Sequence, residues 1–192
     1  MIYPANYDIT ILQNATFKTQ IRCTQGRKTI TSIQTVSGMP TFTAACHDLE
    51  ADDKVVFTGS SACGLNENTV YYVIASGLTA DAFQVSATVS GSSLAITGDF
   101  ANTLYVAKPV DITGYTVDAD IKETTGYTQV ATFSCSLITP ADGLAQLLLD
   151  PATTVGLDVG TYAYDVSLTS GGGERYYWLT GNAAVVRTYS RT

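Results

Sequence analysis

The sequence is poor in charged residues and has no long apolar run. Charged residues make up 14% of the 192-residue chain, and its ten Lys and Arg residues are scattered. Because a phosphate-binding surface needs clustered basic side chains and the net charge is −7, we expect no nucleic-acid partner. No apolar run reaches the roughly 18 residues of a membrane span. The opening MIYPANYDIT lacks the basic and apolar regions of a signal peptide, so we expect neither Sec export nor a membrane partner.

Cysteine and histidine are also scarce. Cys23, Cys46, Cys63 and Cys135 show no CxxC spacing, so we expect free thiols packed as small hydrophobes. Disulfides Cys23–Cys135 or Cys46–Cys63 are the alternatives. A zinc site from Cys46, His47 and Cys63 lacks an evident fourth ligand, and we predict no metal. His47 is the only histidine. We interpret it as a turn residue, because no G-x-S-x-G or Cys/His signature accompanies it.

Short polar and β-branched residues dominate the composition, which favours strands over helices. The pattern is clearest in KPVDITGYTVDADIKE, from Lys108 to Glu123. Pro109 to Gly114 is typical of a turn, and strict alternation follows it. One face of the predicted strand carries Tyr115, Val117, Ala119 and Ile121, and the other carries Thr116, Asp118, Asp120 and Lys122. Such alternation indicates a strand with one buried and one solvated face.

Similar patterns predict strands along the whole chain. The predicted strands are 7–13, 16–24, 29–36, 41–45, 54–58, 69–76, 82–87, 94–97, 104–106, 115–121, 129–138, 143–149, 160–168, 175–179 and 183–189. One helical turn is expected at Pro151, with Asp150 as its N-cap. Gln25-Gly26-Arg27-Lys28 interrupts the pattern, and the strands after it become short and closely spaced, as in small barrels or sandwiches.

The change of pattern predicts one domain inserted into another. The host would be a β-sandwich of residues 1–26 and 108–192, and the insert a small β-barrel of residues 27–107. The fold class is therefore all-β. If the host is continuous across the insertion, the Tyr115–Ile121 face should pack against Phe17, Ile21, Phe133 and Tyr164.

Several polar residues could in principle belong to a catalytic or ligand-binding site, but we expect no catalytic site and no cofactor. Asp118 and Asp120 share a face and could act as paired glycosidase carboxylates; we interpret them as a solubilising face that opposes aggregation. Gly171–Gly173 lacks the helix start and Lys of a phosphate loop and indicates a hairpin. A further acidic cluster is interpreted as a solvated turn, with a weak cation site as the alternative. This cluster comprises Asp48, Glu50, Asp52 and Asp53.

Paired aromatic residues are the best candidates for a contact surface. They are Tyr71, Tyr72, Tyr176, Tyr177 and Trp178. In a regular strand Tyr176 and Trp178 would share one face, and Tyr177 would take the other. One face must pack the core, while the other is free for a protein partner or for stacking on a sugar. All three uses remain open at this stage.

The host resembles a group of tailed-bacteriophage virion proteins. The resemblance rests on short segments, Tyr7–Ile11, Gln13–Phe17, Asp111–Tyr115 and Gly160–Asp165. The host is similar to the immunoglobulin-like N-terminal domain of phage baseplate upper proteins, which implies an immunoglobulin-like sandwich. Such proteins commonly have Gly where Asn14 stands here.

The insert resembles a small β-barrel module of phage fibre proteins, also known from ubiquitin-activating enzymes. The matching segments are His47–Leu49, Asp53–Phe57, Thr69–Ile74 and Ala82–Ser86. That family often has Gly in place of Asp48 and Asp52. The resemblance implies a fold and no ubiquitin chemistry.

These resemblances imply a non-enzymatic virion protein, an assembly adaptor or connector of the tail, neck or baseplate. Its partners would be other virion proteins and copies of itself, and it would be assembled in the bacterial cytoplasm. A capsid decoration or cement protein is one alternative. A receptor-recognition module that binds a host glycan is the other.

Overall fold

The computed structural model describes residues 5–36, 39–59, 65–66, 69–95 and 103–188. Strands make up most of this part of the chain, and they form two compact units. Unit 1 comprises Met1–Cys23 and Ile112–Thr192, and unit 2 comprises Thr24–Asp111. The all-β fold class predicted from the sequence is confirmed.

Unit 2, Thr24–Asp111, extends a few residues further at each end than the predicted insert of residues 27–107. The difference arises at Gln25–Lys28, which the sequence predicted as a break. Instead β4 (Thr24–Ile30) runs through this segment and pairs with β10 (Leu104–Pro109). The register shifts so that Gly26 and Arg27 lie opposite Ala107, and Gly26 has φ 64°. This is a β-bulge with glycine in the left-handed conformation, and it lies inside a strand.

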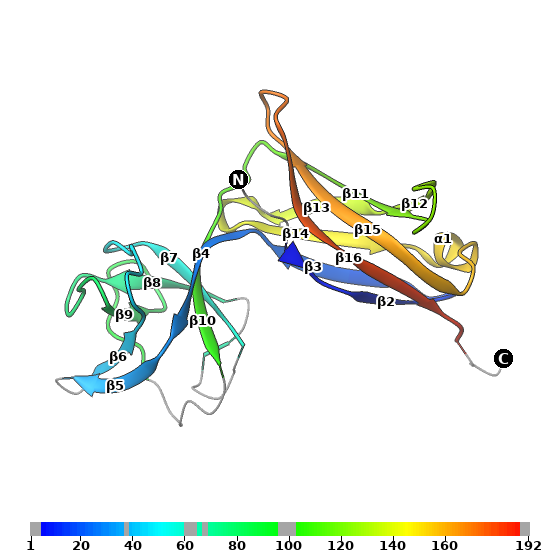
Figure 1. Ribbon diagram of the computed structural model, residues 1–192. Coiled ribbons are helices and arrows are strands. Elements are labelled where there is room, and N and C mark those ends of the chain that lie inside the picture. Colours follow the sequence, from blue (N-terminus) through cyan, green and yellow to red (C-terminus); the bar gives the residue numbers. More distant parts are fainter. Residues whose placement is uncertain (1–4, 37–38, 60–64, 67–68, 96–102, 189–192) are drawn as a thin grey trace. The chain divides into compact units, whose positions relative to one another are not determined.

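Unit 1 is an immunoglobulin-like sandwich of two sheets (Figure 1). The larger sheet has the order β1-β16-β15-β11-β12, with β2 also paired to β16, and the smaller sheet has the order β13-β14-β3. The larger sheet contains β1 (Ala5–Asn6), β2 (Ile9–Leu12), β11 (Thr116–Lys122), β12 (Gln129–Thr132), β15 (Gly160–Thr169) and β16 (Arg175–Val186). The smaller sheet contains β3 (Phe17–Arg22), β13 (Ser134–Thr139) and β14 (Leu144–Leu149).

The core of unit 1 lies on the predicted face of β11. Ala119 and Ile121 are buried in one apolar cluster with Phe133 and Tyr164, and Val117, Phe17 and Ile21 pack against it. The Phe133 ring lies 5.9 Å from the Phe17 ring and 6.3 Å from the Tyr164 ring. Residues from before and after unit 2 therefore share one core, and the packing prediction is confirmed.

Two features of unit 1 differ from the predicted strands. The predicted strands 175–179 and 183–189 are joined in the single strand β16, which ends at Val186 and pairs in parallel with β1 and β2. Residues 129–138, predicted as one strand, divide at Phe133 between the two sheets. The Phe133 backbone N–H donates to the Ala119 carbonyl at 2.9 Å, which fixes the point where the chain passes from β12 to β13.

The predicted helical turn is present as α1 (Pro151–Val155). Asp150 is its N-cap, and the Asp150 carboxylate accepts a hydrogen bond from the Thr153 backbone N–H at 2.6 Å. A 3₁₀ turn, η1 (Pro140–Asp142), precedes β14. The described part of the chain contains no helix with the length and hydropathy needed to cross a bilayer.

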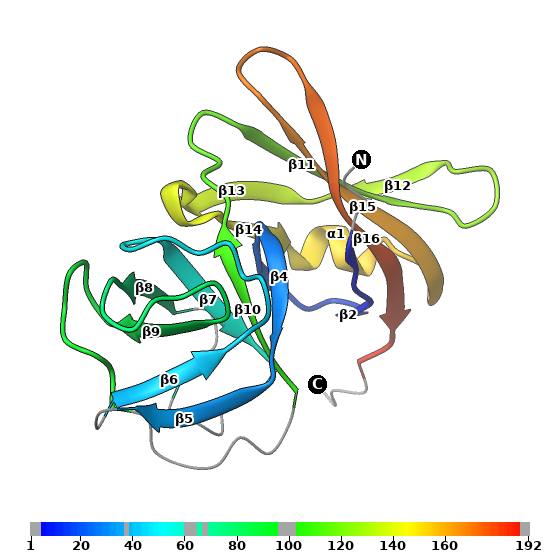
Figure 2. The ribbon, with the colours of Figure 1, turned by 60° about the vertical axis from the view of Figure 1, so that its left-hand side comes forward.

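Unit 2 is a seven-stranded sheet with the order β4-β10-β7-β8-β9-β6-β5. Its remaining strands are β5 (Ser32–Val36), β6 (Met39–Thr43), β7 (Lys54–Thr58), β8 (Val70–Ile74) and β9 (Ala82–Ser86). Figure 2 shows β4 continuing into β5. Among the described residues no ladder closes this sheet into the predicted barrel.

The core of unit 2 is aromatic at its centre. The Phe42 ring lies 5.0 Å from the Phe57 ring and 5.3 Å from the Phe83 ring. All three phenylalanines are fully buried. Of the predicted strand at 94–97, Leu94 and Ala95 lie outside any strand, and the other two residues lie outside the described part of the chain. Each unit thus has a core of its own.

Candidate functional site

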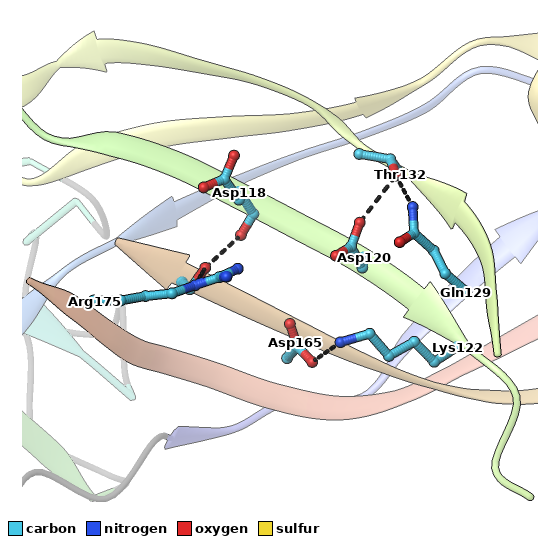
Figure 3. Close-up of polar contacts among 8 residues, drawn as sticks. Asp118, Asp120, Lys122, Gln129, Thr132, Asp165 and Arg175 are labelled. Atoms are coloured by element: carbon cyan, nitrogen blue, oxygen red, sulfur yellow. Dashed lines mark hydrogen bonds and ion pairs between the residues drawn. The ribbon is translucent and has the colours of Figure 1, made fainter. Parts of the chain in front are cut away.

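The outer face of the larger sheet in unit 1 carries a row of polar side chains (Figure 3), and the exposed ring of Tyr177 lies next to Arg175. We call it the polar face, and it comprises Asp118, Asp120 and Lys122 on β11, Asp165 and Ser167 on β15, and Arg175 and Tyr177 on β16. The ladder sets their spacing. Asp118 is opposite Ser167, Asp120 is opposite Asp165, and Ser167 is opposite Tyr177. Because side chains alternate along a strand, all of them emerge on the side away from the core.

A half-buried ion pair lies at one end of the polar face. The Lys122 Nζ lies 2.8 Å from Asp165 Oδ2, and the two side chains keep 27% and 20% of their exposure. The hydrogen bond to Asp165 raises the pKa of Lys122, as do the nearby charges of Asp165 and Asp120. Asp120 and Asp165 face each other across the ladder, which is unfavourable for like charges. Lys122 offsets that repulsion.

Asp120 is also held by the edge strand β12. The Thr132 hydroxyl donates to Asp120 Oδ1 at 2.9 Å, and the Gln129 Nε2 donates to the Thr132 hydroxyl oxygen at 2.6 Å. Figure 3 shows this chain of contacts beside the Lys122–Asp165 pair. The Asp120 and Asp165 carboxylates therefore serve first to join neighbouring strands.

Arg175 and Tyr177 form the other end of the polar face. The Arg175 Nε donates to the Ser167 hydroxyl at 2.9 Å, and Ser167 is fully buried. The Arg175 guanidinium carbon lies 5.5 Å from the centre of the Tyr177 ring, within the range of a cation–π contact. Tyr177 remains 49% exposed. The arrangement presents a fixed ring, a guanidinium and an exposed carboxylate, that of Asp118, to the solvent.

Of the five aromatic residues predicted as a contact surface, Tyr71 belongs to a core. It is 3% exposed, its ring lies 5.8 Å from the Phe57 ring, and its hydroxyl accepts a hydrogen bond from the Asn66 N–H at 2.9 Å. Tyr72, its neighbour on β8, is half-buried. Both belong to unit 2, whereas Tyr176, Tyr177 and Trp178 belong to unit 1.

A β-bulge changes the predicted alternation of Tyr176, Tyr177 and Trp178. The register of β16 shifts between Leu179, which faces Val166, and Tyr177, which faces Ser167. Trp178 is the extra residue and is half-buried, whereas Tyr176 is 39% exposed. Tyr176 donates to Glu174 Oε2 at 2.6 Å, and this bond raises the pKa of Tyr176. The bulge leaves Tyr177 as the most exposed of the three.

His47 occupies a buried turn in unit 2, as predicted. It is 3% exposed, its Nδ1 accepts a hydrogen bond from the Leu49 N–H at 3.0 Å, and its ring meets the edge of Phe83 at 5.1 Å. In the acidic cluster that follows, Asp53 pairs with Lys108 at 2.5 Å. Asp52 accepts a hydrogen bond from the Ser90 N–H at 3.1 Å. These contacts fasten the turn.

The described cysteines are free thiols. Cys23 is buried, Cys135 is half-buried and Cys46 is exposed, so the Cys23–Cys135 disulfide is absent and burial was wrongly predicted for Cys46. Cys63 lies outside the described residues. Within the described ranges no three His, Cys, Asp or Glu side chains are grouped to hold a metal ion.

The sequence indicated which β11 side chains would share the polar face, because alternation is a local signal. It did not indicate the Lys122–Asp165 pair or the Arg175–Ser167 bond. These contacts depend on how β15 is registered against β11 and β16, and register is set by non-local pairing.

Comparison with known proteins assigns no family. No protein-family model matches the chain, and no curated protein matches it. Among solved structures, the chain is similar to AggA, the major subunit of aggregative adherence fimbriae type I from Escherichia coli. The identity is 11%, the match covers 96% of this chain and 91% of that chain, and the TM-score is 0.21. A likeness of this strength carries no argument about function.

Proposed function

We propose that this protein is a non-enzymatic structural component of a tailed-bacteriophage particle, an assembly adaptor of the tail, neck or baseplate. The proposal starts from the resemblance of the segments around Tyr7–Phe17, Asp111–Tyr115 and Gly160–Asp165 to phage virion proteins. It is supported by one structural observation, the insertion of a separately packed β unit into a β-sandwich. Two rigid units on one chain suit a part that joins neighbours.

The polar face is consistent with a structural role. Asp120 and Asp165 make cross-strand contacts with Thr132 and Lys122, so each carboxylate helps to hold the sheet together. Such contacts give a rigid surface that neighbouring proteins can use. We accordingly assign the role of Asp118 and Asp120 to solubility and sheet stability.

Locating the protein in intact particles tests the proposal. Antibodies raised against the recombinant chain would be used for immunogold electron microscopy of phage particles from the encoding host. Labelling confined to the tail, neck or baseplate is expected. Labelling spread over the head would favour the cement alternative, and its absence from purified particles would refute a virion role.

A glycan-binding module is a second candidate, favoured by Tyr177. Its ring is exposed beside the Arg175 guanidinium, and Asp118 lies in the same cross-strand row, two strands away. An exposed aromatic face with polar groups near it is the kind of surface that a sugar ring could stack on. A glycan array would compare the native chain with Tyr177→Ala and with Tyr72→Ala, a matched change in unit 2. Binding lost only in Tyr177→Ala would support this candidate, and no binding by the native chain would refute it.

A further inference from the structure

One side of unit 1 is formed by β12 and β13, which follow each other along the chain. β12 is an edge of the larger sheet and pairs with β11, and β13 is an edge of the smaller sheet and pairs with β14. Within the described residues, each of the two strands has a ladder on one side only. Their other backbone N–H and C=O groups are therefore available to a further strand.

This edge carries no charge. No Asp, Glu, Lys or Arg stands between Glu123 and Asp142, which is the longest uncharged run in unit 1. The opposite edge of the smaller sheet, β3, carries Lys18 and Arg22. Proteins commonly protect an edge strand from pairing by placing charged residues on it, lysine above all. The β3 edge has that protection, and the β12–β13 edge lacks it.

Apolar side chains are exposed along the same segment. Val130 on β12 is 37% exposed, Ile138 on β13 is 45% exposed, and Tyr127 in the turn before β12 is 75% exposed. Tyr127 has φ 57°, a conformation that is unusual for a bulky residue. Exposed aromatic residues of this kind serve as anchors in protein interfaces.

We propose that the β12–β13 edge is a self-association surface, on which β13 pairs in antiparallel fashion with β13 of a second copy of the chain. The net charge of −7 makes copies repel one another in general. Contact is therefore easiest where the contacting strands carry no charge, as β12 and β13 do; the carboxylates nearest to them, Asp118 and Asp120, belong to β11.

The strand directions favour a two-fold arrangement. β13 and β3 are both antiparallel to β14, so they run parallel to each other. A head-to-tail contact would place β13 beside β3 of the next copy as a parallel ladder, which is the less stable kind, and beside Lys18 and Arg22. A two-fold axis instead joins β13 to β13 as an antiparallel ladder and makes the contact self-complementary.

Matched lysine substitutions on the two edges test the proposal. Ser134 and Ser136 are exposed on β13, and the ladder aligns them through Leu148 and Gln146 with Lys18 and Gln20 on β3. The double variant Ser134→Lys/Ser136→Lys adds two lysines to β13. One of them is aligned with Lys18, the lysine that β3 already carries. Gln20→Lys is the control, because it adds a lysine in the same row at the opposite edge.

Sedimentation velocity over a concentration series would measure the association of the full chain. We expect a dimer in the native chain and in Gln20→Lys. In Ser134→Lys/Ser136→Lys, four like charges meet across the axis, and the dimer dissociation constant should rise at least about tenfold. A native chain that stays monomeric, an open-ended aggregate, or equal dimerisation of both variants would overturn the proposal.

Hydrogen exchange provides a second readout that needs no variant. The amides of Ser134–Leu137 should exchange more slowly at concentrations where the native chain is dimeric than where it is monomeric. Protection that appears on other strands instead would place the contact elsewhere and overturn the proposal. The inference is independent of the virion role, because it concerns the chain alone in solution.

Discussion

Among single residues, the described cysteines differ most clearly in their surroundings. Burial raises the pKa of Cys23 to about 12, and burial together with the Asp118 carboxylate raises the pKa of Cys135 to about 11. Because the thiolate is the reactive form, both should resist alkylation in mildly alkaline buffer, whereas the exposed Cys46 should react first. Peptide mapping after timed iodoacetamide treatment measures this order. A Cys63→Ser background removes the remaining thiol, and equally fast labelling of Cys23 would contradict the expectation.

Among the glycines that the structure describes, Gly181 has the least room for a side chain. A Cβ at this position would overlap the Tyr7 carbonyl oxygen and lie 3.0 Å from the Tyr164 ring. We expect Gly181→Ala to lower the free energy of unfolding by about 3 kcal/mol, as overpacking does at rigid sites. Denaturant unfolding measures the change. Gly172→Ala is the control, because the nearest atom there lies 3.6 Å away, at ordinary contact distance. Similar losses in both variants would contradict this account.

The sequence departs from its phage resemblance at residues whose backbone conformation is informative. Asn14, Asp48 and Asp52 stand where the resemblance has glycine, and their φ angles are 56°, 53° and 66°. Asn and Asp are the residues that best tolerate this left-handed region after glycine. Asn and Asp at these turns are therefore compatible with the left-handed backbone that glycine would also adopt.

Among the elements, α1 depends on a single cap with a defined pH response. The Thr153 hydroxyl and N–H lower the pKa of Asp150, so the Asp150 carboxylate is more stable in the folded chain than in the unfolded chain. Its contribution is complete above the ordinary carboxyl pKa and is lost as pH falls through the lowered value. We expect Asp150→Ala to lower the melting temperature of the chain at neutral pH, and the difference from the native chain to shrink in acid.

Thermal unfolding followed by circular dichroism across this pH range measures the effect. Asp150→Asn is the control, because Asn is an equally good N-cap and does not titrate. It should keep most of the stability and lose the pH dependence. A constant difference between Asp150→Ala and the native chain at every pH would show that the carboxylate charge is irrelevant.

The elements also show what sequence patterns can and cannot predict. β7 was predicted with its observed bounds, because KVVFT is a compact apolar strand, and the Asp150-Pro151 start of α1 was a local cap signal. The parallel pairing of β2 with β16 and the passage of the chain between sheets at Phe133 had no local signal. Both arise from contacts between segments far apart in the chain. The sequence also did not predict the two β-bulges. The segment around Gly26 was predicted as a break between strands, and the segment around Trp178 was predicted as a regular strand.

For the whole molecule, the structure predicts that the two units can be separated. Thr24 pairs with Pro109 at the base of unit 2. In unit 1, the Cys23 N–H donates to the Gly143 carbonyl at 2.8 Å, and the Ile112 N–H donates to the Pro140 carbonyl at 2.9 Å. The two ends in unit 1 are thus held at one turn, and a short glycine linker should join them.

We expect the chain 24–111, and the chain with that segment replaced by the linker, each to unfold cooperatively. Each retains its own apolar cluster. Calorimetry of the two fragments measures this, with the full chain as reference. An excised unit 2 that lacks a cooperative transition would show that its core depends on unit 1.

The pairing of β2 with β16 has a consequence for the order of folding. The first two strands of unit 1, β1 and β2, both pair with its last strand, so its larger sheet cannot be completed before the end of β16 leaves the ribosome. Unit 2 is continuous in sequence, and all its strands emerge earlier. Because contacts between distant segments form late, we expect unit 2 to be native while unit 1 is still open. Pulsed hydrogen exchange during refolding should show early protection in β7–β9 and late protection in β2 and β16.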